Sequence, residues 1–226
     1  MGSARARRVP GLYVAGMSLA HDERHALADA LASVGPGRPT LCEGWDTGLL
    51  AAHVVIRDRR PDALPGVLIP AFAGHTDRLQ KSTNADSTYD ELVAKVRSGP
   101  RLSPTMLPVV GDLVNFMEFA IHTEDVLRAQ EGWKARDLSP AEEEGLLSRL
   151  RVMRALGSRR AGVPIVFVTP GGTRLAPRGE ASGAVTIAGE AIDLALYLSG
   201  RRGAARVELS GSDEAIEKVG KAKFSL

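Results

Sequence analysis

The sequence is short of the residues on which several kinds of protein depend. Its 226 residues include a single cysteine, Cys42, and few aromatics, with 5 Phe, 3 Tyr and 2 Trp. One cysteine excludes an internal disulfide framework and any cysteine-based zinc ribbon or iron–sulfur site. The best apolar run, residues 49–56, is far shorter than the roughly 18 residues that a membrane helix needs, and it contains a histidine. We therefore expect a soluble, cytoplasmic protein that does not enter a membrane.

The chain also lacks a strong excess of either charge. Its 29 Lys and Arg nearly balance 27 Asp and Glu, for a formal charge of +2. Three of the arginines lie in residues 1–16, which contain no acidic residue. Because a nucleic-acid surface needs clustered basic residues, we expect no nucleic-acid partner. The apolar part of residues 1–16 is short and broken by Pro10 and Gly11, so we predict a disordered extension rather than a signal peptide.

Helical signals fill the chain up to about residue 160. Ser18 is the predicted N-cap of a helix that ends at Val34, and capping-box patterns start at Thr88 and at Ser139. The remaining helices are expected near residues 48–60, 71–81 and 109–130. Residues 17–160 are therefore predicted to form a helical bundle.

The pattern changes after residue 160. Short β-branched and apolar segments predict strands, separated by turn signals such as Pro170-Gly171-Gly172. The expected strands are residues 164–168, 185–187 and 207–209, and the expected helices are residues 190–198 and 212–221. The prediction is an α+β fold in which residues 161–226 form a small α+β domain behind the bundle.

Histidines are the first candidates for metal ligands, and four of the five differ in their predicted burial. His21 and His25 are four residues apart, a spacing that can chelate a metal, but they point away from the apolar stripe of their helix and are predicted to be surface residues. His53 lies in the middle of an apolar stripe, where a buried imidazole needs a polar partner. Taken alone, His53 is predicted to be a hydrogen-bonded core residue. His75 follows a Pro-rich loop and is a weak candidate ligand.

Glu118 and His122 change the interpretation of His53. They lie four residues apart on one helix, so their side chains share a face, and they could form no more than a hydrogen-bonded pair. With His53 they make a set of two histidines and one carboxylate, which binds a divalent metal and leaves positions open for water or substrate. Asp125 and Asn115 share the face and are predicted to accept hydrogen bonds that fix the imidazole tautomers, although either could be a solvated residue.

Two segments resemble a known family. Residues 40–53, TLCEGWDTGLLAAH, and residues 118–126, EFAIHTEDV, are similar to the mycothiol-dependent maleylpyruvate isomerase family, among the wider DinB/YfiT-like metal-binding bundles. The resemblance implies a DinB-like four-helix bundle followed by a sterol-carrier-like domain. It also implies a metal, usually zinc, held by His53, Glu118 and His122, with nickel as another divalent metal that the site could take.

The resemblance further implies an enzyme of the isomerase or S-transferase type. Mycothiol would be the co-substrate thiol, attacking a small electrophilic substrate. An arginine of the C-terminal domain would lie near the metal, and Arg201 and Arg202 are the candidates, although cations after a helix are often simply solvated. Cys42 is single and lies in a loop, so a packing role is predicted for it.

Three alternatives remain open at the level of sequence. The bundle could be a metal-dependent hydrolase in which metal-bound water replaces the thiol. It could be a non-catalytic binding module, or a bundle in which the histidines and Glu118 are buried and paired without metal. The substrate, the metal and the choice between monomer and homodimer are not fixed by the sequence.

Overall fold

A computed structural model describes residues 15–60, 73–100, 111–178 and 182–224. The first residues of the predicted extension lie outside these ranges, but Ala15 and Gly16 already belong to the first helix. Ser18 is therefore inside that helix and is not its N-cap, because the backbone becomes helical four residues earlier than the sequence suggested. No helix among the described residues is long and apolar enough to cross a membrane.

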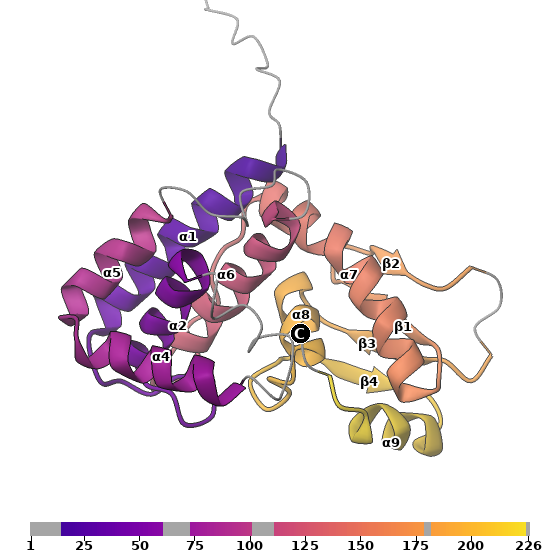
Figure 1. The fold of residues 1–226 in the computed structure, drawn as a ribbon. Helices are drawn as coiled ribbons and strands as arrows, with labels where there is room; N and C mark the ends of the chain where they lie inside the picture. Colours follow the sequence, from indigo (N-terminus) through magenta and orange to yellow (C-terminus); the bar gives the residue numbers. More distant parts are fainter. Residues whose placement is uncertain (1–14, 61–72, 101–110, 179–181, 225–226) are drawn as a thin grey trace, which may run out of the picture.

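The N-terminal part is helical. Its described helices are α1 Ala15–Val34, α2 Thr47–Arg59, α4 Ala73–Ala85, α5 Tyr89–Ser98 and α6 Gly111–Leu127. Helix α1 lies along α6 and also contacts α5, while α2 packs between α4 and α5 (Figure 1). Asp46 caps α2 by accepting a hydrogen bond of 2.8 Å from the Leu49 amide. The capping box predicted at Thr88 is confirmed at the start of α5.

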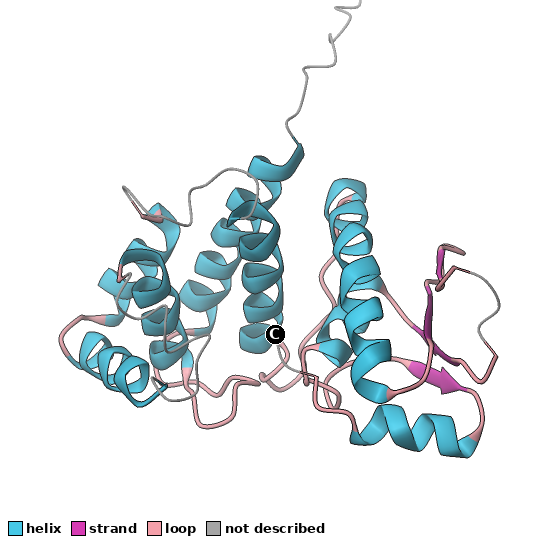
Figure 2. Cartoon of the chain, turned by 45° about the vertical axis from the view of Figure 1, so that its right-hand side comes forward, coloured by secondary structure: helices cyan, strands magenta, loops and turns pink. Residues whose placement is uncertain are grey.

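The C-terminal part combines helices with a small mixed sheet. Its described elements are α7 Pro140–Ala161, β1 Ile165–Val168, β2 Arg174–Leu175, β3 Val185–Ala188, α8 Ala191–Leu198, β4 Glu208–Ser210 and α9 Asp213–Lys221. The strand order is β2-β1-β3-β4, with β1 and β3 parallel and the outer pairs antiparallel. Helix α7 packs against α8, β1 and α9 (Figure 2). The predicted α+β character is confirmed, whereas the two-residue strand β2 was not expected.

Helix α6 contributes side chains to two apolar clusters. The polar side chains of α6 lie between these two clusters. Phe119 and Val126 belong to a cluster with α1, α2 and α5. Phe116 and Ile121 belong to a second cluster, which continues through α7 into the sheet and α8. The core thus runs without a break from α6 into the C-terminal part. Side chains of α6 that fall between the two clusters meet both α2 and the loop after α8.

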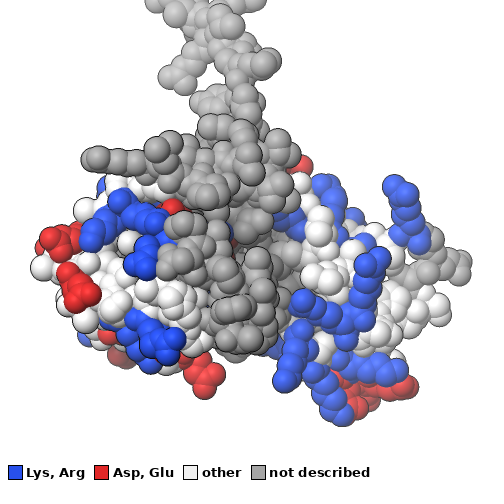
Figure 3. All heavy atoms as spheres, viewed as in Figure 1, with Lys and Arg blue, Asp and Glu red and all other residues white. Residues whose placement is uncertain are grey.

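The surface charge is less evenly spread than the sequence suggested. Figure 3 shows Lys and Arg side chains gathered over the side of the molecule formed by α7 and α9. Exposed members of these helices include Arg151, Arg159 and Lys218. Residues that balance one another along the chain can lie on different faces, so net charge alone does not describe a surface.

Candidate metal centre

Helices α2 and α6 bring His53, Glu118 and His122 together. The Oε1 atom of Glu118 lies 3.2 Å from Nε2 of His53 and 3.1 Å from Nε2 of His122. The side chains are 12%, 21% and 8% exposed, respectively. One possible ligand atom from each residue lies within 4.8 Å of the others. The ring of Trp45 packs 4.9 Å from that of His53 and covers it from the loop before α2.

His122 is held from its other side by Asp125. Its Nδ1 lies 2.9 Å from Oδ2 of Asp125, which is fully buried. If Nδ1 donates its proton to this carboxylate, Nε2 of a neutral ring carries a lone pair toward Oε1 of Glu118. Two facing lone pairs repel unless a proton or a metal cation lies between them. Since His53 Nε2 points at the same oxygen, the three atoms surround a position that favours positive charge.

The titration of the group reflects this convergence. Burial disfavours ionised Glu118, but the charge of His122 and hydrogen bonds from both imidazoles outweigh that cost and hold the pKa of Glu118 well below its usual range. Burial also opposes the charged form of His122, yet the carboxylates of Glu118 and Asp125 raise its pKa well above the usual value. Burial lowers the pKa of His53. The cluster therefore stabilises one carboxylate together with nearby positive charge.

Two imidazoles and one carboxylate fit a divalent metal. Zinc and nickel accept histidine nitrogen and carboxylate oxygen, and three protein ligands leave a coordination position open. A carboxylate on the far nitrogen of a metal-binding histidine is a common means of fixing the ring, and Asp125 has that place beside His122. The donor set and its surroundings thus fit a candidate metal site.

The structure brings Arg201 to this site. Its Nε and Nη2 donate to the two carboxylate oxygens of Asp125 at 2.9 and 2.8 Å, and Nη2 also lies 3.4 Å from Sγ of Cys42. The Cys42 thiol in turn donates to Asp125 Oδ2 at 3.2 Å. The expected packing role for Cys42 is thus incomplete, because the residue belongs to the polar wall of the site.

A second set of possible ligands shares His122. Cys42, His122 and Asp125 also place one donor atom each within 4.8 Å of one another. The guanidinium of Arg201 already contacts both the sulfur and the carboxylate of this set. A metal ion there would lie next to a fixed positive charge, which disfavours it. The set of His53, Glu118 and His122 is therefore the better candidate for a metal site.

A cavity of about 520 Å³ opens beside the three residues. Its walls come from the loop before α2, from α2, from α6 and from the segment after α8. The lining residues are Leu41, Cys42, Glu43, Trp45, His53, Glu118, Ile121, His122, Ser199, Gly200 and Arg201. The volume is within the range of small-molecule sites.

Arg202, the second arginine predicted to lie near the metal, is placed elsewhere. Arg202 donates to the backbone carbonyls of Val219 and Ala222 near the end of α9, and its guanidinium lies over the Phe224 ring. It is directed away from the cavity that Arg201 lines. Cations at a helix C-terminus are favoured by the helix dipole, and this accounts for its position.

Asn115 does not contact an imidazole. Its side-chain oxygen accepts a hydrogen bond of 2.9 Å from Arg57. Arg57 Nε lies 3.6 Å from Glu118 Oε1, longer than a hydrogen bond. Asn115 therefore holds the Arg57 guanidinium near the Glu118 carboxylate instead of fixing a histidine tautomer. Arg57 belongs to α2, so the spacing of residues within α6 could not predict this contact.

The other histidines lie away from the centre. His21 is exposed on α1, and His25 is partly exposed with its ring 4.4 Å from that of His21. His75 is exposed in the first turn of α4. None of these three histidines lines the cavity beside His53.

Comparison with known proteins gives a match of structure only. No family model and no curated sequence matches the chain. Two solved structures match, a mycothiol-dependent maleylpyruvate isomerase and a histidine-to-alanine mutant of it. Each is 21% identical, with a TM-score of 0.55, over 86% of this chain and 92% of the other. The chain therefore shares the fold of that enzyme.

Proposed function

We propose that the chain is a metal-dependent enzyme that uses a small thiol to attack a small electrophilic substrate, in an isomerase or S-transferase reaction. The observation that carries the proposal is the convergence of His53, Glu118 and His122 on one point in the wall of a 520 Å³ cavity. Its support from comparison is the shared fold of an enzyme described as a mycothiol-dependent maleylpyruvate isomerase.

His53, Glu118 and His122 would hold the metal, with zinc or nickel as the expected ion. A divalent metal bound there would stabilise a thiolate at neutral pH, and the thiolate is the nucleophilic form of a thiol. Asp125 keeps the His122 ring oriented and balances part of the charge. Trp45 and Ile121 make the cavity partly apolar and limit the water around the reacting groups.

The chain's own cysteine is not the nucleophile in this proposal. The Cys42 thiol donates a hydrogen bond to Asp125 and also contacts Arg201, so its sulfur is already engaged in the wall of the cavity. The attacking thiol therefore comes from a separate molecule, for which mycothiol is the candidate suggested by the structural neighbour.

Arg201 is proposed to act mainly through Asp125. A guanidinium has five N–H donors. The donors of Arg201 reach both oxygens of Asp125, the sulfur of Cys42 and the carbonyl of Ser199. This leaves a single N–H for a substrate oxygen, so Arg201 has no pair of parallel N–H groups left to hold a substrate carboxylate.

The first experiment measures the metal content of purified protein by mass spectrometry. We expect about one zinc or nickel per chain, lost in His53→Ala and in His122→Ala. His21→Ala is the matched control, because this histidine is exposed and lies outside the cavity. Metal-free protein that takes up no added zinc would rule out the proposal.

The second experiment tests the thiol. Metal-loaded protein is assayed with maleylpyruvate with and without mycothiol, and we expect turnover only when the thiol is present. Arg201→Lys should lower kcat/KM by about tenfold or more, because lysine cannot hold both oxygens of Asp125, whereas Arg202→Lys should not. Hydrolytic activity without thiol would favour the hydrolase, and metal binding without turnover on any electrophile would favour a binding module.

A further inference from the structure

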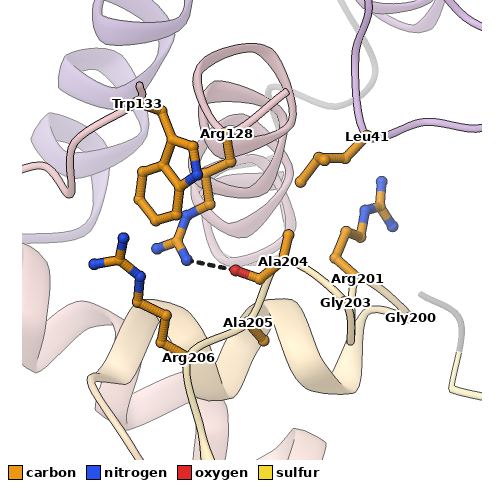
Figure 4. A pocket seen from close by; sticks show the side chains of 9 residues that line it. All are labelled: Leu41, Arg128, Trp133, Gly200, Arg201, Gly203, Ala204, Ala205 and Arg206. Atoms are coloured by element: carbon orange, nitrogen blue, oxygen red, sulfur yellow. Dashed lines mark hydrogen bonds between the residues drawn. The ribbon is translucent and has the colours of Figure 1, made fainter. Parts of the chain in front are cut away.

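A second cavity lies on the other side of Arg201. It has a volume of about 590 Å³ and shares Leu41, Gly200 and Arg201 with the first. Its remaining lining residues are Arg128, Trp133, Gly203, Ala204, Ala205 and Arg206 (Figure 4). The candidate metal ligands are not part of its wall. The question is which of its three arginines can bind a ligand.

The charge of Arg128 is already neutralised. Its Nε lies 2.5 Å from Glu124, and its Nη1 lies 2.5 Å from Asp193 and 2.9 Å from the carbonyl of Ala204. A buried guanidinium between two carboxylates has little attraction left for another anion. Arg128 is therefore a structural wall of the cavity.

Arg201 is directed away from this cavity. In Figure 4 its guanidinium points away from Trp133 and Arg206. It makes two hydrogen bonds to Asp125, so its charge is also balanced.

Arg206 differs from both. Its guanidinium lies 4.2 Å from the centre of the Trp133 ring, and the residue is exposed. Within the described part of the chain, no carboxylate forms an ion pair with it. A cation–π contact holds a guanidinium in place without cancelling its charge. Arg206 is thus positioned by Trp133 and still available to an anion.

We infer that the second cavity binds the carboxylate of a small organic acid, with Arg206 as the contact and Trp133 as the residue that positions it. A single guanidinium offers two parallel N–H groups that match one carboxylate. The wall of Gly203, Ala204 and Ala205 has small side chains, which leaves room for the rest of the molecule. The site goes beyond the proposed function and does not require the metal.

The two tryptophans of the chain allow a direct test, since each cavity contains one of them. Trp45 lines the first cavity and Trp133 the second, and the sequence has 2 Trp in all. An NMR spectrum of the labelled full-length protein therefore shows one indole N–H signal for each cavity, and Trp133→Phe identifies which is which. Benzoate is the probe, and benzamide is its neutral control of the same shape.

We expect benzoate to shift the Trp133 signal in a saturable manner, and benzamide to bind about tenfold more weakly or not at all. Arg206→Ala should remove the benzoate effect, and Arg206→Lys should weaken it. Arg151→Ala is the matched control, because this exposed arginine of α7 lines neither cavity. By calorimetry, Trp133→Phe should reduce the preference for benzoate over benzamide.

Three results would overturn the inference. The first is a shift of the Trp45 signal alone, which would place the anion beside the candidate metal centre. The second is equal binding of benzoate to the wild type and to Arg206→Ala. The third is tighter binding of inorganic phosphate than of benzoate, which would assign the cavity to another class of anion. Because the readout needs neither metal nor turnover, failure of the proposed function would leave this result unaffected.

Discussion

The α6 segment carries two clusters of buried charge that differ in how the charges are satisfied. In the first cluster, Glu118 and His122 face His53 beside an open cavity. In the second, Glu124 and Arg128 join Glu23, Arg136 and Asp193, largely away from solvent. Both clusters are largely buried, so burial alone does not distinguish a ligand site from a structural one.

The difference lies in the direction of donors and acceptors. The Glu124 oxygens each accept a guanidinium hydrogen bond, at 2.5 Å from Arg128 and 2.7 Å from Arg136. The first cluster instead brings two imidazole nitrogens to a single carboxylate oxygen of Glu118, while its nearest guanidiniums are held by Asn115 and Asp125. Charges that satisfy one another away from solvent indicate a structural role, and possible ligand atoms that converge beside a cavity indicate a candidate ligand site.

The largest expected effect comes from breaking the second cluster. Arg128→Ala leaves the carboxylates of Glu124 and Asp193 buried without their shared partner. We expect the free energy of unfolding to fall by about 3–5 kcal/mol, because an uncompensated buried charge is costly. Denaturation with urea, followed by circular dichroism, measures this.

Lys218→Ala is the control for that experiment. Its ion pair with Glu214 is exposed on α9, and its loss should leave the unfolding midpoint unchanged. The Arg128 variant that remains folded should still bind metal at the wild-type ratio. An unfolding free energy equal to that of the wild type would contradict the structural role given to the second cluster.

The next effect separates the clusters by their response to zinc. A ligand that binds only the folded state stabilises it by about 2.7 kcal/mol when its free concentration is 100 times the dissociation constant. We expect this gain for the wild type and for Arg128→Ala, and none for Glu118→Gln, which keeps the shape of the side chain but removes its charge. Thermal unfolding with buffered zinc measures the gain. An equal gain in Glu118→Gln would place the zinc outside the first cluster.

Local signals explain what the sequence could predict. Capping boxes at Thr88 and Ser139 involve neighbours in the chain, and both form as expected. The helical period also places Glu118 and His122 on one face, and the structure brings His53 to that face. The metal that they are proposed to bind remains a prediction.

Long-range packing explains what the sequence could not predict. Arg201 and Arg202 are adjacent, yet one turns to Asp125 and the other to the end of α9. Cys42 reaches the site because the loop before α2 folds against α6, a contact that no spacing reveals. Such outcomes depend on how distant segments meet, so residue type and period do not determine them.

The smallest expected effect comes from the unequal numbers of opposite charges in the second cluster. Its ion pairs join three carboxylates to two guanidiniums, namely Glu23, Glu124 and Asp193 to Arg128 and Arg136. Glu23 has the longest contacts, at 3.3 Å, and burial raises its pKa above 4.5 despite the opposing charge of Arg136. The folded state therefore holds the Glu23 proton more tightly than the unfolded state, so Glu23 favours folding at low pH and loses that contribution as pH rises through its folded pKa. We expect the unfolding free energy of the wild type, relative to Glu23→Gln, to be higher at about pH 5 than at about pH 8. If urea titrations give the same difference at both pH values, Glu23 is as well neutralised as Glu124, and the second cluster has no excess charge.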